Sequence, residues 1–474
     1  MATADALVRA GCFDCLADAL KQYESIRQVP VVVELATAGA VRASALLALR
    51  ERELGTTDSG YLERARELAA TSATVRQDLA PLLDMIGVVP WRAGAGPDQP
   101  LDFYRNRAER LEMLRSLAAR DELSAYVWLA YACEGNSVRT DKNDLVGPID
   151  AMRQMSDMPL LLFRQAICLG VDAKAVEALF EREPRFAELA FFRGLTASGA
   201  VNIEDADARY REAYAWRATW PAATLALANL AMTAEEFASA LDFYDTTVTL
   251  APSHPEALLG KLRALTYLSR HDDALGGADE LLATRSYPGD AYYWRAVNEL
   301  QLERLDRAWD DIEAADKVMV NSDVPKLAGI IEMRRRLLDV ARQKLELSRE
   351  RNRADCETSY YLHLVLADQA RWDHVVEMAV GTAGCLDGAE AYARQEIDRI
   401  AASSVPAARK ARQIARREQQ IASAVRMRAT CWFNAAVANF NLSKPAEARR
   451  FAEKVNTDEQ FGERARELLT RLTK

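Results

Sequence analysis

Histidine, cysteine and carboxylate side chains are the residues of this 474-residue chain that could carry catalysis or bind a metal. The four histidines, His254, His271, His363 and His374, form no HExxH pair on a helix. The sequence also lacks a P-loop, a GxSxG elbow and a GxGxxG turn after a strand. Its 70 acidic residues leave carboxylate-only hydrolysis open, as some glycosidases use it. We therefore predict no enzyme activity and keep a carboxylate enzyme as the alternative.

The seven cysteines are scattered and odd in number, so we expect no disulfide framework. Cys12 and Cys15 have the CxxC spacing, but a metal site would need a second such pair or nearby histidines. Haem attachment would need a histidine where Leu16 stands, and a redox pair would need a thioredoxin-like βαβ context. We expect Cys12 and Cys15 to be small core residues on a helix, and we predict no metal and no cofactor.

The composition is that of a soluble helical protein, with 50% hydrophobic and 28% charged residues. Alanine, leucine, arginine and glutamate are abundant and alternating β-branched runs are few, which predicts helix throughout. A net charge of −9 argues against general binding to nucleic acid or anionic membranes. We see no run of 18 apolar residues and no signal peptide in residues 1–10. We expect a cytoplasmic location by default, or a periplasmic or lipid-anchored one if a leader precedes residue 1.

The sequence repeats itself every 34 residues over 187–322, in four rows that begin at Ala187, Pro221, Pro255 and Gly289. One column of these rows is small throughout: Ala206, Ala240, Ala274 and Ala308. A second column, four places on, is mostly bulky: Tyr210, Tyr244, Ala278 and Ile312. A 34-residue period with small residues in fixed columns predicts a solenoid of helix–turn–helix units, each burying the apolar face of its neighbour.

These columns resemble the tetratricopeptide repeat (TPR) family, most clearly over 187–322 and more loosely over 356–380 and 429–455. The resemblance implies an all-α, right-handed superhelix. Small residues expected in the first helices are present as Gly194, Ala228, Ala296 and Ala436. Leu262 and His363 depart from that pattern, which puts the curvature of their repeats in doubt.

The flanking segments divide the chain further. Pro81 suits the first turn of a short helix over 79–86, and separate helices are expected over 386–402 and 406–442. The expected parts are an N-terminal helical subdomain with degenerate repeats (1–86), an irregular Gly/Pro loop (87–100), degenerate helical repeats (101–186), the four clear repeats (187–322), and divergent repeats with long arginine-rich helices and a capping helix (323–474).

The TPR resemblance implies a concave groove, lined by the first helices, that binds a peptide. Glu188 opens the groove-facing series in the first repeat. The partner-binding positions carried over from the family are Phe191, Leu195, Leu225, Asn229, Met232, Arg263, Tyr267, Tyr293 and Val297. Asn229 and Arg263 could donate hydrogen bonds to a peptide. Arg263 is the only basic residue in the set, which argues against a clamp for a peptide carboxylate. The alternative is that other parts of the chain fill the groove.

Two stretches are rich in arginine. Residues 334–353 contain eight basic and three acidic residues, and residues 409–428 contain seven basic and one acidic residue. Basic helices can bind nucleic acid, but no aromatic residues are interleaved here. An acidic protein partner is the better hypothesis.

We predict a non-catalytic scaffold or adaptor that binds a protein or peptide in the groove of 187–322. One alternative is a self-assembling array that stacks through its terminal repeats. The other is an enzyme of the helical-toroid type that uses carboxylates, although such enzymes lack the 34-residue period with alanine columns.

Overall fold

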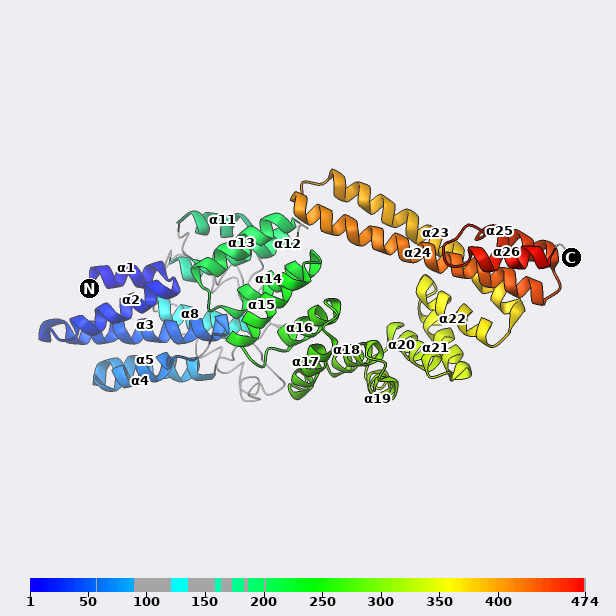
Figure 1. The fold of residues 1–474 in the computed structure, drawn as a ribbon. Helices are drawn as coiled ribbons and strands as arrows, with labels where there is room; N and C mark the ends of the chain where they lie inside the picture. The colour runs from blue at the N-terminus through cyan, green and yellow to red at the C-terminus, as the bar shows by residue number, and fades with distance from the viewer. Residues whose placement is uncertain are drawn as a thin grey trace. The chain divides into compact units, whose positions relative to one another are not determined.

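The computed structural model describes residues 1–56, 58–88, 121–134, 158–162, 173–182, 186–199 and 202–472. Every regular element in these ranges is helical (Figure 1). The chain forms two compact units. Unit 1 contains Met1–Thr233 and Ala238–Gly260, and unit 2 contains Ala234–Phe237 and Lys261–Lys474. The expected loop over 87–100 falls almost wholly outside the described residues, as do most of the repeats expected over 101–186.

Unit 1 begins with helices that pack in succession, each on the next. They are α1 (Ala2–Ala10), α2 (Phe13–Ile26), the 3₁₀ turn η1 (Pro30–Val32), α3 (Val33–Leu54), α4 (Tyr61–Ala70) and α5 (Ala73–Val88). Gly11 has φ 72°, the left-handed conformation that lets α1 end and α2 begin two residues later. The expectation for Pro81 is wrong: α5 starts at Ala73, where Ser72 caps it, so Pro81 lies in the helix interior.

A charged network lies in the core of unit 1, where α8 (Glu122–Glu134) packs against α3 and α5. The Arg50 guanidinium pairs with the carboxylates of Glu53 and Glu188, and its side chain is only 2% exposed. Tyr126 joins the network, with its hydroxyl 3.1 Å from Arg50 Nη1. Glu188 is 4% exposed, so the expectation that it faces a groove is wrong. Arg50 provides the positive charge that offsets the cost of burying the carboxylate of Glu188.

The four repeats predicted from the columns are present as helix pairs. They are α12 (Ala187–Gly199) with α13 (Ile203–Trp216), α14 (Pro221–Thr233) with α15 (Phe237–Leu250), α16 (Pro255–Tyr267) with α17 (His271–Ala283), and α18 (Pro288–Gln301) with α19 (Leu305–Asp316). The alanine column is fully buried in all four pairs. Close approach also explains a small residue of the first helices: a Cβ added to Gly194 would lie 2.5 Å from the Tyr210 ring. The all-α, TPR-like architecture is confirmed by these pairs.

The turn between the two helices of a pair repeats one backbone conformation, left-handed with φ between 55° and 64°. It occurs at Glu235, Ser269, Glu303, Arg336, Ala370 and Ser443. Residues with a Cβ cost roughly 1–2 kcal/mol in this conformation, whereas glycine adopts it freely. Each non-glycine residue at such a turn therefore lowers the free energy of unfolding, and the packing of the repeats more than offsets this cost.

Replacing Ala370 by glycine is expected to raise the free energy of unfolding by roughly 0.5–1 kcal/mol. The gain is the relieved left-handed strain, reduced by the extra entropy that glycine gives the unfolded chain. Urea unfolding followed by circular dichroism measures it. Ala367→Gly, in the last turn of the preceding helix, is the matched control and should lower stability by about 1 kcal/mol. A loss of stability in both variants would contradict the strain argument.

Unit 2 continues with further helix pairs and ends in a long hairpin and a cap. These helices are α20 (Asp323–Arg334), α21 (Leu338–Arg351), α22 (Cys356–Asp368), α23 (Trp372–Ala402), α24 (Ala407–Asn441), α25 (Pro445–Glu453) and α26 (Gly462–Arg471). α23 and α24 pack side by side as an antiparallel hairpin (Figure 1). The separate helix expected over 386–402 is wrong, because α23 runs unbroken through Gly381, Gly384 and Gly388.

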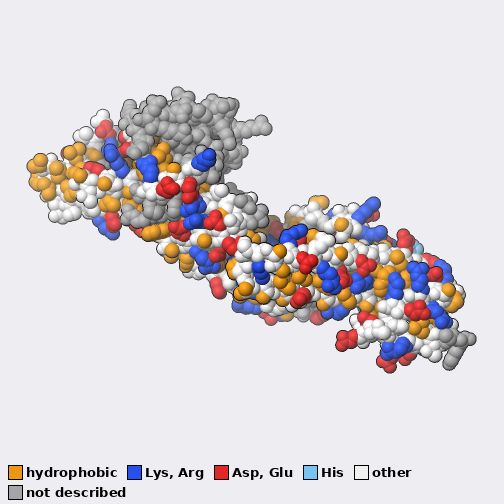
Figure 2. Space-filling model, turned by 90° about the horizontal axis from the view of Figure 1, so that it is seen from above, with side chains coloured by type: hydrophobic (Ala, Val, Ile, Leu, Met, Phe, Trp, Pro, Cys, Tyr) orange, Lys and Arg blue, Asp and Glu red, His pale blue; other side chains and the backbone are white. Residues whose placement is uncertain are grey.

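One stretch among the described residues, Pro30–Leu54, is long and apolar enough to cross a membrane by length and composition. Its most apolar window has a mean hydropathy of 1.6 and is 56% buried. Core helices and signal sequences pass the same test, so this is weak evidence for a membrane span. Hydrophobic side chains gather at the end of unit 1 where α2 turns into α3 (Figure 2), and Val31 and Leu35 there are 92% and 65% exposed.

Candidate functional site

The groove residues predicted in unit 1 differ widely in exposure. Leu195 is 44% exposed, whereas Leu225 is only 9% exposed and belongs to the buried core. Phe191 is half-buried, with its ring centroid 4.7 Å from that of Trp220 and 5.3 Å from that of Tyr210. Met232 is also half-buried. Of these four, Leu195 is the most exposed, and the prediction for Leu225 is wrong because the core covers it.

Asn229 uses its side chain within unit 1. Its Oδ1 accepts a hydrogen bond of 2.7 Å from the Tyr244 hydroxyl, and its Nδ2 donates one of 3.0 Å to Glu256. These bonds connect α14, α15 and α16. Asn229 thus bridges neighbouring repeats, and donation from this side chain to a peptide stays a prediction.

The groove residues predicted in unit 2 lie on α16 and α18. Arg263 is exposed, and its guanidinium carbon lies 5.7 Å above the Trp294 ring. Tyr267 is 41% exposed. Tyr293 and Val297 are half-buried and pack against a core cluster that includes Ala296 and Leu327. Burial raises the pKa of Tyr293 to about 12, so its phenol stays neutral. Arg263 and Tyr267 are therefore the accessible members of this set.

Tyr267 is the centre of an aromatic cluster. Its ring stacks on Phe237 at 4.6 Å with an interplanar angle of 19°, and meets the edge of Trp294 at 5.8 Å. Aromatic pairs in such geometries contribute about 0.5–1.5 kcal/mol beyond their buried area. The cluster thus holds a partly exposed ring in a fixed orientation beside Arg263.

A second element also contacts this cluster. It is the end of the α23–α24 hairpin where the chain turns from α23 into α24. Ala393 is the last buried residue of α23, and Ala424 is the first buried residue of α24. We call residues 394–423 the arm. None of its residues is buried, and its α24 part, residues 407–423, has five basic residues and one acidic residue. The arm therefore has no core to fix it in place.

Arginines of the arm contact Glu235 and Glu236, which lie in the turn between α14 and α15. Arg409 Nε and Arg412 Nη2 lie 3.0 and 2.5 Å from Glu236 Oε1. Arg416 Nε and Arg417 Nη2 lie 3.2 and 3.4 Å from Glu235 Oε1.

Arg416 also covers aromatic rings. Its guanidinium carbon lies 4.9 Å from the centroid of Phe237 and 5.6 Å from that of Tyr267. We call Glu235, Glu236, Phe237 and Tyr267 the acidic–aromatic site. The site matches an arginine-bearing helix in both charge and ring geometry.

The protonation state of the site favours this contact. Burial opposes ionisation of Glu236, but the hydrogen bonds from Arg409 and Arg412 outweigh it and lower the pKa of Glu236 below its usual value. The carboxylate is accordingly charged at neutral pH. The arginine side chains range from 13% to 55% exposed, so salt will screen these pairs.

Sequence reasoning did not find the acidic–aromatic site, although it singled out the basic stretch 409–428. That stretch was expected to bind an acidic protein partner, and in the structure the acidic residues belong to the same chain. Adjacent glutamates at Glu235 and Glu236 were the only local signal. The alternative that the chain covers part of its own groove is supported at Tyr267.

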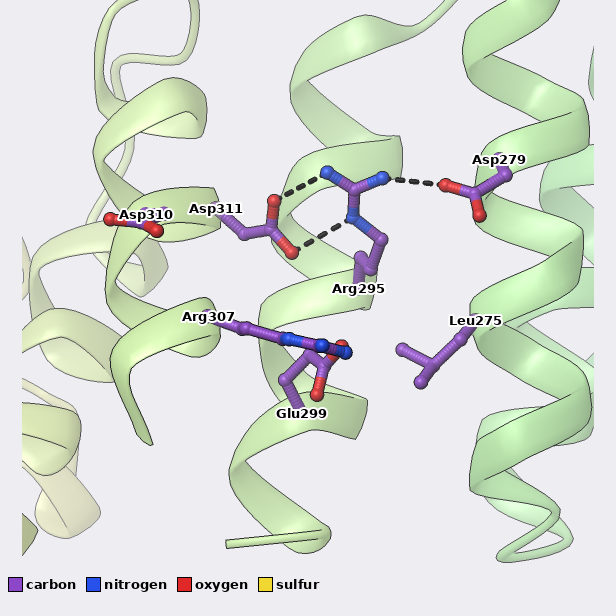
Figure 3. A pocket seen from close by; sticks show the side chains of 7 residues that line it. All are labelled: Leu275, Asp279, Arg295, Glu299, Arg307, Asp310 and Asp311. Carbon is purple, nitrogen blue, oxygen red and sulfur yellow. Dashed lines mark hydrogen bonds and ion pairs between the residues drawn. The ribbon is translucent and has the colours of Figure 1, made fainter. Parts of the chain in front are cut away.

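A pocket of about 390 Å³ lies among α17, α18 and α19 (Figure 3). Arg295 donates to both carboxylate oxygens of Asp311, at 2.8 and 2.6 Å, and to Asp279 at 2.6 Å. These hydrogen bonds, foremost those with Asp311, raise the pKa of Arg295 against the opposing effect of burial. Glu299 and Arg307 also line the pocket. Because Arg295 joins three successive helices, we assign the pocket to repeat packing.

The cysteines differ from expectation. Cys12 and Cys15 are buried as predicted but form a disulfide at the start of α2, and a second disulfide joins Cys356 to Cys385. The second pair could not be predicted from spacing, because the packing of α22 on α23 brings together cysteines that are 29 residues apart in sequence. Cys431 is free and buried. The side chain of Cys133 and the whole of Cys168 lie outside the described part.

Within the described residues, no group of three or more histidine, cysteine or acidic side chains could hold a metal ion. The Cys12–Cys15 disulfide occupies the two sulfur atoms that a CxxC metal site would need there.

No family model and no curated protein sequence matches the chain. Solved structures similar to it include TPR proteins. YrrB, described as a TPR protein with an unusual peptide-binding site, is 16% identical, with a TM-score of 0.36 and coverage of 47% of this chain and 97% of YrrB. A TPR protein from Parabacteroides merdae is 14% identical, with a TM-score of 0.36 and coverage of 61% and 99%.

PilW, described as a type IV pilus biogenesis factor, is 15% identical, with a TM-score of 0.35 and coverage of 48% of this chain and 100% of PilW. The TPR-like architecture stated above rests on the helix pairs themselves and not on these similarities.

Proposed function

We propose that the protein is a non-catalytic scaffold and that a protein segment binds unit 2 on the surface around Arg263, Tyr267 and Trp294. The observation that carries this proposal is the partly exposed Tyr267 ring, held between Phe237 and Trp294 with arginines above the cluster. Exposed, preorganised aromatic and arginine side chains are the residues that dominate binding energy at protein interfaces. Of the predicted groove positions in unit 1, Leu195 is the one with comparable exposure.

Site-specific photo-crosslinking tests this proposal. Tyr267 is replaced by p-benzoylphenylalanine, and the full chain is irradiated in a lysate of its source. Tyr287 is the matched control, because it is also a tyrosine of unit 2 and is 47% exposed against 41% for Tyr267. We expect a discrete cross-linked protein from position 267 and none from position 287. The same product from both positions, or none from either, would overturn the proposal.

A further inference from the structure

The arm covers part of the acidic–aromatic site. Arg409, Arg412 and Arg416 are spaced three and four residues apart, so they lie on one face of α24. That face meets Glu235, Glu236 and the rings of Phe237 and Tyr267. An arginine-bearing helix is therefore already bound to the site within the chain.

We infer that the acidic–aromatic site binds an arginine-rich helical segment of a partner protein, and that the arm occupies the site until the partner displaces it. This inference rests on the proposed function and deepens it by naming the chemistry of the partner. A partner presenting arginines at positions i, i+3 and i+7 of a helix reproduces the contacts that the arm makes.

The nature of the arm contact makes displacement feasible. Residues 394–423 bury no side chain, so release of the arm exposes no core of its own. Contacts that hold the arm among the described residues include part-exposed ion pairs and stacking of Arg416 on aromatic rings, and both kinds of contact can be remade with another helix. The second half of α24 stays fixed because Cys431, Phe433 and Ala436 are buried in the repeat core.

The hairpin also gives the arm a defined reach. The Cys356–Cys385 disulfide joins α22 to α23 at a point that precedes the arm in the chain. From there, α23 and α24 pack along each other. An arm tethered in this way acts at a high effective concentration, so a free helix competes with it at a disadvantage. Apparent affinity for a partner is reduced by the fraction of chains in which the arm is docked.

The test uses a fluorescently labelled synthetic peptide with the sequence of residues 405–423, titrated by anisotropy against three forms of the full chain. These are the wild type, an arm-neutralised variant, and the arm-neutralised variant that also has Glu235→Gln and Glu236→Gln. The arm-neutralised variant is Arg409→Gln, Arg412→Gln, Arg416→Gln and Arg417→Gln. These substitutions leave the core intact, because none of the four arginines is buried.

We expect the peptide to bind the arm-neutralised chain at least about tenfold more tightly than the wild type, because the site is then vacant. Removing the two glutamate charges should weaken that binding by about tenfold or more. A peptide of the same composition, with its arginines spread around the helix, should bind no form well. A control chain has the same charge change outside the arm: Arg334→Gln, Arg336→Gln, Arg349→Gln and Arg353→Gln. It should behave as the wild type does.

Equal affinity for wild-type and arm-neutralised chains would overturn the inference, as would binding that does not depend on Glu235 and Glu236. A wild-type chain that sediments as a dimer, and as a monomer once the arm is neutralised, would show docking between copies and overturn the displacement model. The proposed function fails separately. A cross-link at position 267 without peptide binding leaves the scaffold proposal standing and removes only the arginine-helix partner.

Discussion

Replacing Arg50 by alanine is expected to lower the free energy of unfolding of unit 1 by about 3–5 kcal/mol. Arg50 is the cation between two buried carboxylates, those of Glu53 and Glu188, with side chains 4% and 5% exposed. Burial opposes its charge, but Tyr126 and Glu53 outweigh that effect and raise the pKa of Arg50. Without the guanidinium, the carboxylates keep their desolvation cost and lose the attraction that offsets it.

Urea unfolding, with peptide-resolved hydrogen exchange of α3 to assign the change to unit 1, measures this effect. Arg64→Ala is the matched control, because Arg64 pairs with Glu24 and Glu67 at a position 46% exposed. Exposed pairs contribute at most about 1 kcal/mol, so the control should change little. Similar losses in the two variants would show that the buried position of Arg50 has no special role. Adding Glu53→Gln and Glu188→Gln to an Arg50→Met chain should recover part of the loss.

The repeat architecture was predictable because its signal is local. Ala206, Ala240, Ala274 and Ala308 recur at a fixed interval, and each is buried for the same reason, the close approach of packed helices. The same reasoning failed where a departure was compensated nearby. Leu262 breaks the small-residue pattern yet is fully buried, and Gly260, two residues earlier, gives the Tyr244 ring its space instead.

The candidate site was predictable only in part, because a family register gives positions on a helix and not the partners of a side chain. Arg263 and Tyr267 are exposed, whereas Leu225 and Glu188 are buried. The arm could not be foreseen, since Arg409 and Glu236 are 173 residues apart. A basic stretch in sequence indicates an acidic counterpart, but not whether that counterpart lies in another molecule or in the same chain.

The departure at His363 has an energetic consequence for unit 2. His363 is fully buried, with Nδ1 2.7 Å from the Tyr360 carbonyl oxygen and Nε2 3.1 Å from Asn434 Nδ2. In the neutral ring, Nδ1–H donates to the carbonyl and Nε2 accepts from the amide. A proton on Nε2 would place the Nε2–H donor against the Nδ2–H donor of Asn434. Burial lowers the pKa of His363 to about 4, and the neighbouring Cys431, whose pKa burial raises to about 12, adds no negative charge to offset it.

Stability of unit 2 should therefore fall as the solution is acidified through the range set by this histidine. In the unfolded chain a histidine has its ordinary pKa of 6.5. Between that value and about 4 the unfolded state binds a proton that the folded state excludes, so the contribution is complete above the unfolded pKa and is lost as the pH falls toward the folded one. The loss between about pH 7.5 and about pH 4.5 is on the order of 2.5 kcal/mol.

His363→Gln isolates this term, because glutamine offers a donor and an acceptor and does not titrate. Urea unfolding at the two pH values should show that the variant loses about 2.5 kcal/mol less than the wild type on acidification. His374→Gln makes the same substitution at an exposed position of α23 and should keep the wild-type pH dependence. If His363→Gln and wild type lose stability in parallel, the folded chain accommodates a charged imidazole at this position, and the small-residue column tolerates His363 for its volume alone.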